Sequence, residues 1–104
     1  VHHGSIKSIC YIINNKCAYA PDVNYIDSKD LRYLKNLKYF IVDCLRYNFH
    51  PTHFNLDDVL KLIRKLKPKK AILTNLSNEI DYNEIKKKLP KNVIPAHDGL
   101  TVLI

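Results

Sequence analysis

Glycine, cysteine and long apolar runs are all scarce in this chain, and each shortage excludes a class of protein. Only two glycines, Gly4 and Gly99, and five prolines occur among the 104 residues, so no flexible linker divides the chain. No stretch approaches the roughly 18 apolar residues of a transmembrane helix, and no charged leader precedes an apolar segment at the start. We therefore expect residues 1–104 to form a single unit, soluble and cytoplasmic, with no membrane partner.

The cysteines are too few and too irregular for a disulfide framework. Cys10, Cys17 and Cys44 are an odd number and show no CxxC spacing, which also argues against a zinc ribbon. Cys10 and Cys44 lie in apolar runs, where buried reduced thiols are expected. The sequence thus favours a reducing compartment.

Lysine and arginine outnumber the acidic residues. The resulting net charge of +7 raises the question of whether the chain binds nucleic acid. The lysines form two clusters, one at Lys65, Lys67, Lys69 and Lys70 and the other at Lys86, Lys87, Lys88 and Lys91. Both clusters flank apolar segments, as the solvated face of a helix does, and that is the commoner explanation. The alternative is a surface that attracts RNA or phosphate. Charge alone does not choose between them.

The apolar pattern predicts strands and helices in alternation, which is typical of an α/β layer architecture. Strands are expected over 8–13, 17–19, 39–42, 71–73, 93–94 and 101–104, and helices over 28–35, 56–66 and 82–89. The helix over 56–66 has the clearest signal, because its apolar residues recur at helical spacing and Asn55 can cap its start.

Polar residues able to bind metal or move protons follow several of the predicted strands. They are Asp22, His50, His53 and Asn75, with His2 and His3 before the first strand. Ligands dispersed over successive strand ends are how an α/β fold gathers a metal site from distant sequence. Each residue alone has a simpler explanation, since a lone histidine is more often a surface or capping residue and Asp22 follows a proline, as turn residues do.

In their order and spacing, five segments resemble the successive motifs of the metallo-β-lactamase superfamily. They are His3-Gly4, Tyr19-Ala20-Pro21-Asp22, Asp43-Cys44-Leu45-Arg46, His50-Pro51-Thr52-His53 and Leu73-Thr74-Asn75. The similarity is greatest to the phosphodiesterase branch, which includes the cyclic phosphodiesterase of phosphonate breakdown and the tRNA 3′-end-processing enzymes. The resemblance implies an α/β fold, the C-terminal half of an αββα sandwich, with a mixed sheet and helices on one face.

The same resemblance assigns roles to residues. It implies that zinc or manganese is the cofactor, with His3 and Asp22 as metal ligands and His53 as the general acid or base acting on a phosphodiester substrate. His50 is a neighbour of His53 in the same loop and a second catalytic candidate. Asn75 stands where the family has its last metal-binding histidine, and a neutral carboxamide binds such metals far more weakly than an imidazole.

The family motif His-x-His-x-Asp-His, which supplies most of both metal shells, does not occur in these 104 residues. We therefore expect the chain to be inactive alone, with the alternative that it binds no metal. We also expect it to pair with a separate N-terminal half or with itself through the apolar inner face of its sheet. The alternative is a non-catalytic interaction or nucleic-acid-binding module that reuses the half-fold and its basic surface.

Overall fold

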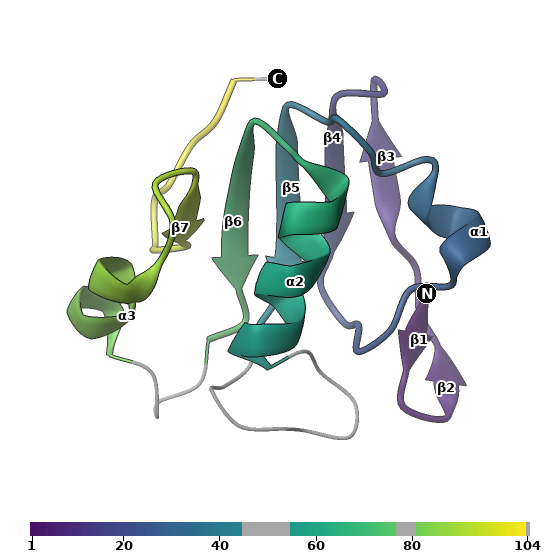
Figure 1. Cartoon of the computed structure of the whole chain (residues 1–104), viewed down its shortest axis with the longest axis horizontal. Helices are drawn as coiled ribbons and strands as arrows, with labels where there is room; N and C mark the ends of the chain where they lie inside the picture. Colours follow the sequence, from purple (N-terminus) through teal and green to yellow (C-terminus); the bar gives the residue numbers. More distant parts are fainter. Residues whose placement is uncertain (45–54, 77–80, 104) are drawn as a thin grey trace.

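A five-stranded mixed sheet organises the computed structural model, which describes residues 1–44, 55–76 and 81–103. Its strands follow the chain order: β3 (Tyr11–Ile13), β4 (Cys17–Ala20), β5 (Tyr39–Asp43), β6 (Lys70–Thr74) and β7 (Val93–Pro95). β3 and β4 are antiparallel, whereas β4, β5, β6 and β7 are all parallel. The carboxyl ends of four strands therefore meet at one edge of the sheet, and their amino ends meet at the opposite edge (Figure 1).

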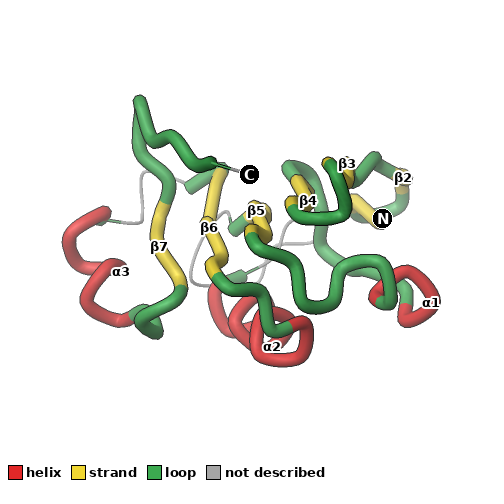
Figure 2. Tube along the Cα trace, turned by 90° about the horizontal axis from the view of Figure 1, so that it is seen from above, coloured by secondary structure: helices red, strands yellow, loops and turns green. Residues whose placement is uncertain are grey.

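In the described part of the chain three helices connect the strands, and all of them lie on the same face of the sheet (Figure 2). They are α1 (Ser28–Leu31), α2 (Leu56–Leu66) and α3 (Tyr82–Lys88). The main core lies between this face and the helices, where Phe40, Val42, Val59 and Leu66 are completely buried. The predicted α/β class, with a mixed sheet and helices on one face, is confirmed. No helix in the described part of the chain is long and apolar enough to cross a membrane.

α2 matches the sequence prediction residue by residue. Leu56, Val59, Ile63 and Leu66 form its buried stripe, and the side chain of Asn55 accepts a hydrogen bond from the Asp58 amide at 2.8 Å. The helix ends at Lys67 in the left-handed conformation, with the amide of Lys67 bonded to the carbonyl of Ile63.

The helix expected over 28–35 is shorter, because α1 ends at Leu31. Asp27 occupies the N-cap position but makes no capping hydrogen bond. Its carboxylate lies 3.0 Å from Nε2 of His2 instead, so this side chain makes a long-range contact rather than a helix cap.

Two short strands near the start of the chain, β1 (His2–His3) and β2 (Ile6–Lys7), form a small separate hairpin that the apolar pattern does not predict. The strand expected over 101–104 is wrong as far as the structure describes it, because residues 101–103 form no strand. The chain turns at Gly99, where φ is +84°, and Leu103 is 81% exposed. Figure 2 shows this last segment on the side of the sheet away from the helices.

Candidate functional site

Polar side chains gather at the carboxyl edge of the parallel strands. Asp43 is the last residue of β5, Asp22 follows β4 by two residues, Asn75 directly follows β6, and His97 follows β7 by two residues. Open α/β sheets place their chemistry at this edge, because loops that leave adjacent parallel strands converge there. The fold therefore brings predicted site residues from distant parts of the sequence to the same side of the molecule (Figure 1).

Asp43 is the buried centre of this edge. Its side chain is completely inaccessible to solvent, and one carboxylate oxygen accepts a hydrogen bond from the amide of Val23 at 3.2 Å. The other oxygen accepts one from Nδ2 of Asn75 at 3.3 Å. A single carboxylate thus ties the end of β5 to the loop after β4 and to the residue after β6. The sequence placed Asp43 in a motif segment without giving it a role; its position directly after the apolar run 39–42 was a further signal.

Asn75 has an exposed side chain and a left-handed backbone, with φ of +61°. Asparagine tolerates this conformation better than most residues do. Since its amide nitrogen donates to Asp43, its side chain is oriented by the buried carboxylate. Asn75 also lines a cavity of about 410 Å³ together with Thr74, Leu76, Ala96, His97 and Asp98. An open cavity beside a strand end is where a ligand would be expected.

His3 and Asp22 lie in segments that are hydrogen-bonded to one another. The amide of Gly4 donates to the Asn24 side chain at 3.1 Å, and the amide of Asn24 donates to the carbonyl of His2 at 2.9 Å. These bonds hold the β1 segment against the residues just after Asp22. His3 is half-buried and Asp22 is exposed. The predicted catalytic residues His50 and His53 lie outside the described residues.

The three cysteines are free, as expected from the sequence. Burial raises the pKa of all three thiols, and for Cys44 burial and the adjacent Asp43 carboxylate raise the pKa to about 12. A thiol with so high a pKa is neutral near pH 7, so Cys44 is a poor nucleophile.

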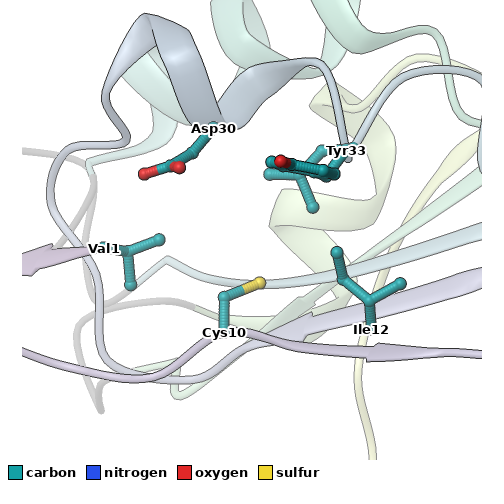
Figure 3. Close-up of a pocket in the computed structure, with 6 residues that line it drawn as sticks. Val1, Cys10, Ile12, Asp30 and Tyr33 are labelled. Atoms are coloured by element: carbon teal, nitrogen blue, oxygen red, sulfur yellow. The ribbon is translucent and has the colours of Figure 1, made fainter.

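A second pocket, of about 240 Å³, lies between α1 and the start of β3, away from the candidate site. Figure 3 shows Cys10 and Ile12 on one side of it and Asp30 and Tyr33 on the other, with Val1 at its end. None of the predicted site residues that the structure describes lines this pocket.

The residues at the carboxyl edge do not by themselves fit a complete metal centre. Among the described residues, no group of three or more histidine, cysteine, aspartate or glutamate side chains is placed to hold a metal ion. A zinc site normally takes three or four protein ligands. Asn75, the third predicted metal position, directs its amide hydrogen to Asp43 rather than presenting an anionic or imidazole donor.

Comparison with known proteins agrees with this geometry. The model of a family described as the beta-lactamase superfamily domain matches residues 1–74. A solved structure described as a new diphosphatase from the PhnP family superimposes with a TM-score of 0.96 at 32% identity. That superposition covers 100% of this chain and 41% of the diphosphatase chain. No curated protein matches the sequence.

The fold and the polar carboxyl edge define a hydrolase-like α/β domain of the metallo-β-lactamase type. The chain belongs to the metallo-β-lactamase superfamily, and its five-stranded sheet with helices on one face corresponds to a half of that fold. The resemblance found in the sequence motifs is thereby confirmed.

Proposed function

We propose that this chain supplies one part of the active site of a metal-dependent phosphodiesterase. The observation that carries the proposal is the superposition of the whole chain on a PhnP-family diphosphatase with a TM-score of 0.96 at 32% identity. In support, Asn75 and Val23, the residue after Asp22, both donate hydrogen bonds to one buried carboxylate at the carboxyl edge, which is the arrangement that a site shared between strand ends requires.

In this proposal His3 and Asp22 are two of the ligands for zinc or manganese, and Asn75 is a weakened ligand position. His53 is the proposed general acid or base, with His50 beside it in the same loop. The remaining ligands come from a polypeptide segment outside these 104 residues, so the chain alone is inactive.

The open face of the sheet, which is the exposed part formed by β3 and β4 on the side away from the helices, supports pairing with such a segment. Strand alternation places Tyr11, Ile13 and Tyr19 on the face opposite the helices, where they are 53%, 43% and 38% exposed. The diphosphatase chain is longer than the region that this chain matches, and in our proposal a separate half, or a second copy, covers this apolar face.

The test is reconstitution. The part of the PhnP-family diphosphatase that this chain does not match is prepared as a separate polypeptide and mixed with the 104-residue chain, manganese or zinc, and bis(p-nitrophenyl) phosphate. We expect hydrolysis from the mixture and none from either piece. Asp22→Asn should abolish it, whereas Asp57→Asn, which removes an exposed carboxylate on α2, should leave it unchanged.

Two results would overturn the proposal. One is an inactive mixture in which the two pieces nonetheless associate. The other is a chain that hydrolyses the substrate at the same rate without the second piece. Light scattering tests the pairing surface separately: a stable monomer that binds no hydrophobic dye would exclude a role for the open face in association.

A further inference from the structure

The amino edge of the sheet, opposite the candidate site, carries a dense set of lysines. Four segments meet there: residues 14–16, 32–38, 64–70 and 86–92. Together they hold most of the 17 lysines and arginines of the chain and no aspartate or glutamate. The lysine cluster that precedes β6 thus lies beside lysines from two segments far away in the sequence, 14–16 and 32–38, and the linear sequence does not indicate this.

Three of these lysines form one row across the sheet. Cys17, Tyr39 and Lys70 are paired in register on β4, β5 and β6, so the residues before them, Lys16, Lys38 and Lys69, form the next row. Backbone hydrogen bonds continue into it, since the amide of Lys38 donates to the carbonyl of Lys16 at 2.8 Å. Neighbouring strands are about 4.8 Å apart, so the three Cα atoms span about 10 Å.

Beside this row lies a small cavity with three more lysines. It has a volume of about 200 Å³ and is lined by Lys35, Asn36, Lys65, Leu66 and Lys67. The amide of Asn36 donates to the carbonyl of Leu66 at 2.9 Å, which joins the segment after α1 to the end of α2. Strand alternation places the row on the same face of the sheet as Ala18 and Phe40, the face that the helices cover. The row and the cavity are therefore on the same side of the molecule.

The simpler explanation for these basic residues is that they stabilise the end of a helix, and it accounts for only some of them. Lys65 and Lys67 lie at the end of α2, where cations stabilise the negative end of the helix dipole. Lys16, Lys38 and Lys69 lie on no helix. Within the described residues no ion pair involves any of these five lysines. Placing them close together without an acidic partner costs energy through mutual repulsion, which a bound polyanion would offset.

We propose that this amino edge, defined by Lys16, Lys38 and Lys69 with Lys35, Lys65 and Lys67, binds the phosphate backbone of single-stranded nucleic acid. A line of single charges matches a chain of phosphates. The apolar residues between these lysines, Leu37, Leu66 and Pro68, are buried, so the edge has no apolar side chain at these positions to insert into a bilayer. The inference concerns the edge opposite the candidate site and does not depend on metal or on hydrolysis.

The test measures binding of a fluorescent 20-residue oligouridylate to the 104-residue chain, in the presence of EDTA, at several salt concentrations. Each neutralised phosphate of a single strand adds about −0.7 to the slope of log K against log salt, so six contacts give about −4. The triple variant Lys16→Gln, Lys38→Gln, Lys69→Gln should reduce the slope by about 2. Between 50 and 200 mM salt, the wild type should then lose about 300-fold in affinity and the variant about 20-fold.

The matched control removes the same number of charges elsewhere. Lys7, Lys29 and Lys61 are exposed and lie on β2, α1 and the middle of α2. Their triple glutamine variant should keep the wild-type slope, and circular dichroism should show that both variants are folded. Binding of an oligothymidylate of the same length shows whether the edge distinguishes RNA from DNA. Binding of either oligonucleotide with the expected slopes supports the proposal.

Three results would overturn it. The first is no binding at 50 mM salt. The second is an equal fall in slope for both triple variants, which would mean that only net charge matters. The third is a chain that does not bind the oligonucleotide but binds vesicles that contain phosphatidylserine, with this binding lost in the Lys16/Lys38/Lys69 variant. The edge would then be a membrane contact. Because EDTA is present throughout, failure here is distinct from failure of the reconstituted hydrolase.

Discussion

Replacing Asp43 by asparagine tests whether the buried carboxylate organises the carboxyl edge. The substitution keeps the shape of the side chain but turns one acceptor oxygen into an NH2 donor. That NH2 group must face either the amide of Val23 or Nδ2 of Asn75, and both of these are donors. One of the two hydrogen bonds is therefore lost, whichever way the new amide is oriented.

The loss should be large for a conservative change. A hydrogen bond to a charged group contributes about 1.5–3 kcal/mol to stability, and Asp43 is completely buried, so water cannot replace the missing partner. We expect Asp43→Asn to lower the free energy of unfolding by about 2 kcal/mol. With a urea dependence of about 2 kcal/mol per M, the unfolding midpoint should fall by about 1 M.

Urea unfolding followed by circular dichroism measures this shift. Asp98→Asn, at an exposed position, should change the unfolding free energy by less than about 0.5 kcal/mol. In the double variant Asp43→Asn, Asn75→Asp, the new amide can donate to the new carboxylate, so part of the stability should return. A midpoint unchanged by Asp43→Asn, or a double variant whose loss is the sum of the two single losses, would refute a coupled pair at this edge.

Four further outcomes are expected. Asn55→Ala removes the cap of α2 and should cost about 1 kcal/mol in a thermal melt, whereas Lys61→Ala on the same helix should be close to neutral; equal losses would contradict a capping role. Because the pKa of Cys44 is raised from 9.0 to about 12, its contribution to stability is present below pH 9 and is lost as the pH rises from 9 toward 12. At pH 8 Cys44 should resist a thiol reagent until urea is added; immediate reaction of all three thiols would contradict its burial. In the reconstituted hydrolase, Asn75→His adds an imidazole ligand and should tighten zinc binding. The gain should be no smaller than the roughly 10–100-fold that an outer-shell contact contributes. Calorimetry measures the affinity, and an unchanged value would exclude Asn75 as a ligand position.

The parts of the fold that sequence predicts are those with local causes. α2 follows from a stripe of residues three and four apart and from Asn55, whose hydrogen-bond partner is three residues away. The hairpin of β3 and β4 follows in the same way, because Asn14 and Asn15 adopt φ of +53° and +55° in the turn. The small β1–β2 hairpin has no such local signal, since it depends on bonds from His2 to the carbonyl of Tyr25.

The candidate site likewise contains residues that the sequence identifies and residues whose role depends on distant contacts. Asp22 and Asn75 are identifiable because each follows an apolar strand, and this also places them at one edge of the sheet. The role of Asp43 is decided by Val23 and Asn75, which are 20 and 32 positions away, and no local pattern shows such a pairing. The row of Lys16, Lys38 and Lys69 likewise exists only through strand register.

The opposite ends of the parallel strands differ in charge, and this gives the molecule a permanent dipole moment along the strand direction. Asp57 and Asp58 begin α2 at the carboxyl edge, while Arg64 and Lys65 end it at the amino edge. The side-chain charges thus oppose the dipole of the helix backbone. A polyanion approaching in dilute salt turns the molecule so that the amino edge meets it first, and the carboxyl edge with Asp22 and Asn75 is left facing away. Encounter with a charged partner is therefore oriented before any contact is made, and added salt removes the orientation.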